Sequence, residues 1–166
     1  VVDVVEVGAA AVLVDAGVGD LLGARVHARI GVVSVVAVHA GLDDVSVAVA
    51  DGYVDPSGGT ECVPGMGIHY INFALFGQPV DPLKPVALLY MPSGEGLRLV
   101  GVEWFVVDAD QNLGTHNDAR PMLFGKQFDG PMPGHSAQMP VHYDLHAYIW
   151  KGNPDGVLTT WNPKVH

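Results

Sequence analysis

The chain has 166 residues, with 18 Asp and Glu against 8 Lys and Arg, which gives a formal net charge of −10. Hydrophobic residues make up 49% of it and charged residues only 16%, a composition that excludes intrinsic disorder. An acidic chain without a Lys/Arg cluster is a poor partner for nucleic acid, because phosphate neutralisation supplies most non-specific affinity. The longest uncharged stretch near the start, Ile30–Leu42, has 13 residues, which is too short to span a bilayer.

The composition divides the chain into two parts, although its length predicts a single domain over residues 1–166. Residues 1–50 hold 17 Val and 10 Ala but no aromatic residue, Pro or Met, whereas all 12 Pro and all 5 Met lie in residues 51–166. Two explanations account for this uneven composition. Either residues 1–52 are a real Val/Ala-rich segment packed against the rest, or the assignments in 1–48 only approximate the true chain. We therefore look for function in the body, residues 53–166.

Helix and strand signals compete in the Val/Ala-rich segment. Val and Ile favour strands by propensity, but their spacing does not alternate cleanly. Towards its end, Asp43 and Asp44 stand where negative charge favours a helix N-terminus, and Gly52 stands at the C-cap position. We therefore predict helix over residues 20–51 and interpret the segment 1–52 as helical.

The body alternates between turn chemistry and β-rich runs, which predicts a strand-rich structure. Two of these runs, Val86–Met91 and Leu97–Val107, are separated by five residues and predict a β-hairpin. Residues Gly114–Met139 are rich in Gly, Pro and polar side chains and predict a long loop. The predicted fold class is α+β, with N-terminal helices packed on a mainly antiparallel sheet. The four predicted strands are Ile68–Phe76, Val86–Met91, Leu97–Val107 and Val141–Trp150.

A single carboxylate stands in the apolar run Leu97–Val107. Because side chains alternate between the two faces of a strand, Glu103 shares its predicted face with Leu99 and Phe105. A buried carboxylate has to be protonated, paired or bound to a metal. Glu103 is therefore either hydrogen-bonded in a polar groove, or it is a metal ligand or a catalytic acid–base group.

His69 is a candidate partner for Glu103, because it lies beside Ile71 in another predicted strand. Gly65 and Gly67 precede it and permit a close approach of the backbone or an unusual turn. The residue is either a core histidine satisfied by hydrogen bonds or a ligand.

The run His142–His146 holds two further histidines. It is not an HExxH motif, because Tyr143 occupies the Glu position, so a zinc-protease interpretation fails. On a helix the two histidines would share one ion. The preceding Pro140 and the aromatic residues that follow favour a strand instead, where the two histidines lie roughly 13 Å apart, too far for one ion.

The predicted site is therefore His69, Glu103 and His146, with His142 and Asp144 as substitutes. Two histidines and one carboxylate can hold zinc or non-haem iron with open coordination positions. Copper is a further candidate ion, because Met132, His135, Met139 and His142 form a Met/His-rich stretch, although loop packing explains that stretch as well.

Other functional motifs are incomplete or absent in the sequence. The segment Asp108–Gly114 begins like a calcium loop, but its Gly falls one place late and Ala119 stands where the bidentate Glu belongs. The sequence contains no phosphate loop, dinucleotide fingerprint or G-x-S-x-G elbow, which disfavours nucleotide-binding and serine-hydrolase functions.

Several motifs within residues 49–165 resemble those of a family of small exported bacterial proteins without a settled function. Its members typically read G-x-H-[YF]-[VI]-N, E-A-L-x-Y, V-E-Y and L-H-V-W-x-W-x-x-N-P, and end in N-P-x-V with a Cys soon after. The corresponding segments of this chain are Gly65–Asn72, Ala87–Tyr90, Arg98–Trp104, His142–Trp150, Asn153–Pro154 and Trp161–Pro163.

The resemblance implies an extracellular or periplasmic location, and it carries over His69, Glu103 and His146 as motif positions, whereas His142 matches only some members. Members usually pair a Cys near Cys62 with the terminal Cys, and the sequence given ends at His166, which leaves Cys62 without that partner. No signal peptide precedes the motifs, which fits a mature exported chain and equally a cytosolic one.

Two functions of different classes are compatible with these residues. The first is an exported protein that binds a divalent metal or a small polar ligand through the His/Glu cluster; if it is an enzyme, Glu103 is a ligand or the general base. The alternative is a non-catalytic extracellular structural or assembly-forming protein, without metal, which associates with itself. The sequence identifies neither a substrate nor a reaction.

Overall fold

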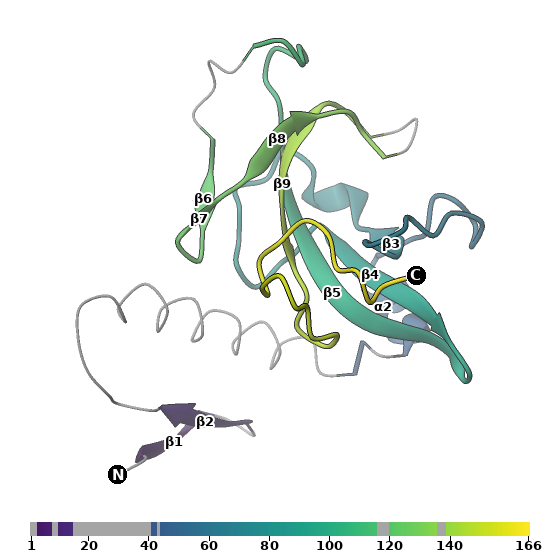
Figure 1. Ribbon diagram of the computed structural model, residues 1–166, viewed down its shortest axis with the longest axis vertical. Coiled ribbons are helices and arrows are strands. Elements are labelled where there is room, and N and C mark those ends of the chain that lie inside the picture. Colours follow the sequence, from purple (N-terminus) through teal and green to yellow (C-terminus); the bar gives the residue numbers. More distant parts are fainter. Residues whose placement is uncertain (1–2, 8–9, 15–40, 43, 116–119, 136–138) are drawn as a thin grey trace.

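The computed structural model describes residues 3–7, 10–14, 41–42, 44–115, 120–135 and 139–166. Its centre is a five-stranded antiparallel sheet in the order β3–β4–β5–β9–β8, which forms the twisted body of the molecule in Figure 1. β4 and β5 are neighbours, and β9 pairs with the other side of β5. The strands are β3 (Ile68–Ile71), β4 (Ala87–Ser93), β5 (Gly96–Val107), β8 (Asp129–Met132) and β9 (His142–Ala147).

Two hairpins and two short helical elements accompany the sheet. β1 pairs with β2, and β6 pairs with β7, both antiparallel. Within the part of the chain that the structure describes, no helix is long and apolar enough to cross a membrane. The bounds are β1 (Asp3–Val7), β2 (Ala10–Val14), α2 (Val45–Ala50), the 3-10 helix η1 (Phe73–Leu75), β6 (Met122–Leu123) and β7 (Lys126–Gln127).

The predicted α+β class, with N-terminal helices packed on a sheet, is wrong. Among the described residues the structure is mainly antiparallel sheet, with one short α-helix and one 3-10 turn. Residues 3–7 and 10–14, which were expected to be helical, pair as strands. These segments are rich in valine, whose branched side chain favours strands. That propensity explains why they form strands and not helices. The helix predicted for residues 20–40 lies outside the described residues.

The end of the predicted helix is confirmed. Asp44 is the N-cap of α2, and its carboxylate accepts a hydrogen bond of 2.8 Å from the backbone N–H of Ser46. Such a cap satisfies a backbone donor that the first helical turn leaves unpaired. Gly52 follows the helix with φ +91°, a conformation that a residue with a Cβ rarely adopts.

Each of the four predicted strands overlaps one strand of the sheet, with shifted ends. β3 stops at Ile71 because the side chain of Asn72 accepts a hydrogen bond from Ala74 N and begins η1. The hairpin loop is shorter than predicted, since Ser93 pairs with Gly96 across β4 and β5. The long loop predicted over Gly114–Met139 contains the short strands β6, β7 and β8.

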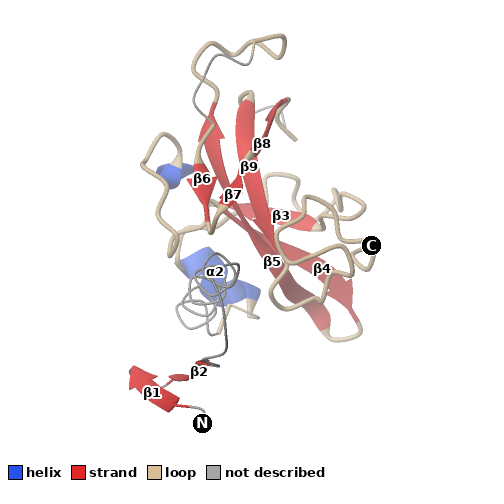
Figure 2. Cartoon of the chain, turned by 60° about the vertical axis from the view of Figure 1, so that its left-hand side comes forward, coloured by secondary structure: helices blue, strands red, loops and turns tan. Residues whose placement is uncertain are grey.

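One face of the sheet is apolar and is covered by α2, which lies to one side of the sheet in Figure 2. The hydroxyl of Tyr90 donates to the backbone oxygen of Leu42, and that of Tyr53 donates to Pro85 O, so the segments flanking α2 are tied to this face. Its buried cluster is Leu42, Ala48, Tyr53, Leu88, Tyr90, Leu99, Val102, Trp104, Phe128, Tyr143, Leu145 and Ala147.

A β-bulge changes the predicted alternation on β5. Leu89 pairs with Gly101 but Tyr90 pairs with Leu99, so Val100 is an extra residue in the ladder. Leu99 consequently packs in the apolar cluster, on the face opposite to Glu103, where strict alternation had placed the two together. The face that carries Glu103 also holds Asp144, His142 and His146, and it positions the candidate site.

Candidate metal centre

Three strands bring the predicted ligands together. In the register of the sheet, Glu103 on β5 pairs with His146 on β9 and with Ala87 on β4. His69 on β3 pairs with Leu89 on β4, so its side chain crosses β4 diagonally to Glu103, and its Nε2 lies 3.6 Å from Oε2. One ligand atom from each of His69, Glu103 and His146 lies within 4.8 Å of the others.

The converging groups are removed from solvent. The residue exposures are 7% for His69, 0% for Glu103 and 1% for His146. His69 Nε2, both carboxylate oxygens of Glu103 and both ring nitrogens of His146 have no hydrogen-bond partner among the described residues. A buried donor or acceptor without a partner costs about 1–3 kcal/mol, and more when it is charged. The arrangement is therefore unfavourable unless another group satisfies these atoms.

Two histidines are oriented by the backbone in the manner of metal ligands. His142 has its Nδ1 2.9 Å from Pro140 O, and this contact fixes Nδ1–H as the donor and leaves the buried Nε2 with a lone pair. His69 makes a hydrogen bond to the backbone of Gly67, and its Nε2 is the nitrogen left without a partner. Metal-binding histidines commonly donate their second nitrogen to a carbonyl or carboxylate in this way.

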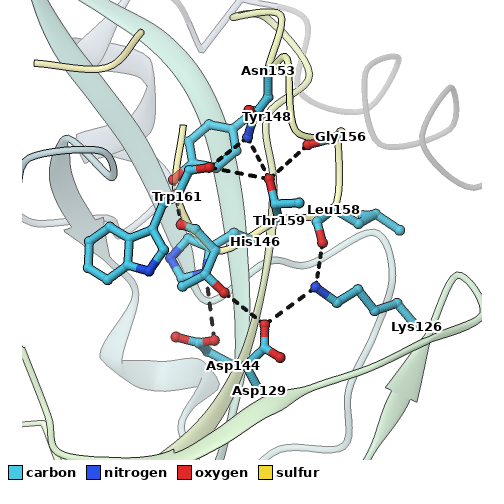
Figure 3. Close-up of polar contacts among 11 residues, drawn as sticks. Lys126, Asp129, Asp144, His146, Tyr148, Asn153, Gly156, Leu158, Thr159 and Trp161 are labelled. Atoms are coloured by element: carbon cyan, nitrogen blue, oxygen red, sulfur yellow. Dashed lines mark hydrogen bonds and ion pairs between the residues drawn. The ribbon is translucent and has the colours of Figure 1, made fainter. Parts of the chain in front are cut away.

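Asp144 lies between two of the histidines rather than at the centre of the cluster. Its Oδ1 is 3.7 Å from His146 Nδ1, the contact drawn in Figure 3, and its Oδ2 is 3.9 Å from His142 Nε2. Burial alone would raise the pKa of the Asp144 carboxyl, but the neighbouring histidines outweigh burial and lower it. Asp144 therefore stays ionised and orients His146, as the outer carboxylate of a carboxylate–histidine–metal triad does.

The C-terminal segment closes one end of the cluster. The ring of Tyr148 stacks on that of His146, with centroids 6.2 Å apart, and its hydroxyl lies 2.8 Å from Gly65 O and 2.9 Å from Thr160 O. Thr160 in turn donates to Asp129 at 2.7 Å, so β8 is tied to the same segment; Figure 3 shows Asp129 close to Asp144. Movement of His146 is thereby restricted.

The electrostatics favour neutral imidazoles around the carboxyl of Glu103. Burial lowers the pKa of His69 to about 3, with a further contribution from the charges of His146 and His135. Burial likewise lowers the pKa of His135 and of His142. These rings are neutral at pH 7, which is the form that binds metal.

The other two groups respond to burial differently. Burial raises the pKa of the Glu103 carboxyl, because the low dielectric disfavours its charged form. For His146, burial lowers the pKa, but the carboxylate of Asp144, 3.7 Å from Nδ1, and the charge of Glu103 outweigh burial, so the pKa rises. A cation at this point would let Glu103 ionise and would replace the proton of His146.

A fourth histidine, His135, reaches the cluster from the loop before β9. Glu103, His135 and His142 form a second group whose ligand atoms all lie within 4.8 Å of one another. The sequence left two interpretations for His135, a copper ligand or a residue of loop packing, and it was not among the predicted ligands. The signal that could have identified it is the Met/His-rich stretch, in which it precedes His142 by seven residues.

A small pocket of about 20 Å³ opens beside the cluster, and His69 and His135 lie in its wall together with Asp55 and Glu61. Asp55 is held by hydrogen bonds from the backbone and hydroxyl of Ser57. Two carboxylates at the mouth favour the approach of a cation, since they raise its local concentration.

A larger cavity, of about 380 Å³, lies between the loop of residues 78–84 and the side chains of Trp104 and Phe105. Its charged residues, Asp81 and Lys84, face each other in an exposed pair 3.9 Å apart. Because no buried titratable group lines it, this cavity is a weaker candidate for metal binding or catalysis than the small pocket.

No protein-family model, curated protein or solved structure matches this chain. The resemblance of its motifs to exported bacterial proteins stays a prediction. The case for a function rests on the site.

Proposed function

We propose that this protein binds a divalent metal ion through His69, Glu103 and His146. The observation that carries the proposal is the convergence of their buried ligand atoms within 4.8 Å, with no hydrogen-bond partner among the described residues. Native proteins pair nearly all buried polar groups, so a set of this size calls for a partner from outside the chain. A cation satisfies two imidazole lone pairs and a carboxylate together, which a proton on any one of them does not.

The separations support coordination better than direct hydrogen bonding. Two ligands about 2.1 Å from one ion, at angles of about 90–110°, lie about 3.0–3.4 Å apart. The 3.6 Å between His69 Nε2 and Glu103 Oε2 is too long for a hydrogen bond, and it approaches that spacing. A small movement of side chains would complete the coordination.

The ligand set suits zinc and iron(II), and imidazole also accepts copper. Three protein ligands leave open positions on such an ion, which a water or a small polar ligand can take from the pocket beside His69. The proposal does not assign a reaction. If the protein is an enzyme, its chemistry takes place at those open positions.

We also infer an extracellular or periplasmic location, which the resemblance of the motifs alone supports. Detection of the native protein in the medium or periplasmic fraction, rather than in the cytosol, tests this part.

Elemental analysis tests metal binding directly. Protein stripped with a chelator, reloaded with Zn²⁺ and dialysed should hold at least one ion per chain. His69→Ala should hold less, whereas His166→Ala, which changes an exposed histidine outside the cluster, should match the wild type. Near-ultraviolet circular dichroism of the variants separates loss of a ligand from loss of the fold. A wild-type protein that holds no ion would contradict the proposal and favour a non-catalytic module.

A further inference from the structure

We propose that the centre holds two divalent ions, with the Glu103 carboxylate bridging them. This inference rests on the proposed function and extends it. The first ion lies between His69, Glu103 and His146, and the second between Glu103, His135 and His142. Both sets have ligand atoms within 4.8 Å of one another, and Glu103 is the residue that they share.

Glu103 has the properties that a bridging ligand needs. Both Oε1 and Oε2 are buried and without a hydrogen-bond partner among the described residues, so each oxygen is open to an ion of its own. A carboxylate accepts through two oxygens and about four lone pairs, which makes it the usual bridge of paired metal sites. One ion bound by His69 and His146 would occupy one side of the carboxylate and leave the other buried and unpaired.

The histidines of the second set are arranged as ligands. His142 is 0% exposed, and the contact of its Nδ1 with Pro140 O leaves Nε2 as the lone-pair nitrogen. His135 has a buried Nδ1 without a partner among the described residues. The two rings meet edge to face with centroids 5.4 Å apart, and the ring of His135 lies 5.5 Å from that of His69. The two sets are therefore adjacent.

The loop that carries His135 is built to approach the sheet closely. A Cβ on Gly134 would collide with the backbone oxygen of Met139. Only glycine therefore lets these two backbone segments of the loop come together. The backbone N–H of His135 donates to the sulfur of Met139, and Met139 packs with Phe105 in a buried cluster on the site face. These contacts hold His135 over Glu103.

The base of the loop is also fixed, and it positions His142. Gln111 donates to Val141 O at 3.0 Å and accepts from Val141 N at 3.0 Å, so its side-chain amide pairs with both backbone groups of that residue. Asp108 N donates to the same oxygen at 2.8 Å. The residue before His142 is thus anchored by two separate groups, which preorganises the ligand.

The cluster compensates half of the charge of two divalent ions. Four neutral histidines contribute no charge, while Glu103 and Asp144 contribute two negative charges within the cluster. Asp144 lies 3.7 Å from His146 and 3.9 Å from His142, one histidine of each set. It therefore serves both sets from a position between them.

Titration of metal-free protein with Cu²⁺, which imidazole ligands accept, tests the inference, with bound ion counted by elemental analysis after dialysis and spin coupling followed by electron paramagnetic resonance. The wild type should bind two ions per chain and show an exchange-coupled pair, since paired sites hold ions about 3.5–4 Å apart. His135→Ala and His142→Ala should each bind one ion with an uncoupled signal. His135→Ala is the milder change, because His135 is only partly buried and lies in a loop.

Matched controls separate the two sets. His166→Ala and Glu95→Gln alter exposed residues of the same types and should keep two coupled ions. One uncoupled ion in the wild type, kept in His135→Ala and His142→Ala but lost in His69→Ala, would overturn the second ion and leave the first intact. No bound ion in the wild type would overturn both proposals.

Discussion

His69 Nε2 lies 3.6 Å from Glu103 Oε2, although the two residues belong to strands that are separated by β4. On β4, Glu103 pairs with Ala87 and His69 pairs with Leu89, so the two side chains meet diagonally across that strand. Both atoms are buried and neither has a hydrogen-bond partner among the described residues. Burial of this pair without partners costs free energy in the metal-free protein, and a bound cation removes that cost.

Glu103→Gln should abolish stabilisation by metal. Zn²⁺ at 100 times its Kd adds about 2.7 kcal/mol to the free energy of unfolding, which raises Tm by roughly 5–10 °C for a chain of this size. The variant should unfold in chelator at or above the wild-type temperature, because an amide removes a carboxyl whose ionisation burial disfavours, and it should show no rise with Zn²⁺. Glu95→Gln, at an exposed turn, is the control and should keep the rise. A full rise in Glu103→Gln would exclude Glu103 as a ligand.

Asp144→Asn should weaken metal binding without changing the number of ions. Loss of an outer carboxylate typically costs 10–100-fold in affinity, because the histidine it orients loses basicity and position. A competition titration against a chromophoric chelator measures the change in Kd. A decrease in stoichiometry, rather than in affinity, would show that Asp144 is a direct ligand.

Gly67→Ala should destabilise the fold and displace His69. Gly67 has φ +98°, and a Cβ there would collide with Tyr90 O, so backbone strain of roughly 1–2 kcal/mol adds to a steric cost of about 1–3 kcal/mol. Gly77→Ala is the control, since Gly77 has φ +72° but open space around it, and should cost only the strain. Urea unfolding measures both. Equal costs in the two variants would show that the close approach to Tyr90 has no effect.

Tyr53 should contribute to unfolding at alkaline pH. Burial raises the pKa of its hydroxyl to about 12, with a further contribution from Asp51, whereas the unfolded value is near 10. A raised folded pKa stabilises the fold fully below about pH 10, and this contribution is lost as pH rises through about 12. Tyr53→Phe should therefore show a shallower fall in unfolding free energy over this interval.

The variant also loses the hydrogen bond from Tyr53 to Pro85 O, which should cost about 1 kcal/mol at neutral pH. Urea unfolding at several pH values separates the two effects. An unchanged slope between pH 10 and 12 would show that Tyr53 does not titrate with unfolding.

Much of the site follows from the alternation of side chains along two strands. The prediction that His142–His146 forms a strand rather than a helix is confirmed, and it places Asp144 and both histidines on the face of Glu103. The glycine-rich approach to His69 is confirmed at Gly67, where the backbone passes close to β4. These features are local, so propensity and period are enough to find them.

Other features depend on contacts between distant segments. The bulge at Val100 arises in the pairing of β4 with β5, and the glycine inside the strand, Gly101, is its sequence signal. His135 reaches Glu103 only because Gly134 and Met139 bring the loop over the sheet, which no period predicts. The prediction of helix near the N-terminus is wrong at residues 3–7 and 10–14, because the strand propensity of valine outweighed an indistinct pattern.

Anomalous diffraction from crystals of zinc-loaded protein, recorded at the zinc absorption edge, is the most direct test of the metal centre. We predict an anomalous peak about 2.0–2.2 Å from His69 Nε2, from a carboxylate oxygen of Glu103 and from a ring nitrogen of His146. Well-ordered side chains at these three positions with no peak between them, in protein that carries zinc elsewhere, would contradict it.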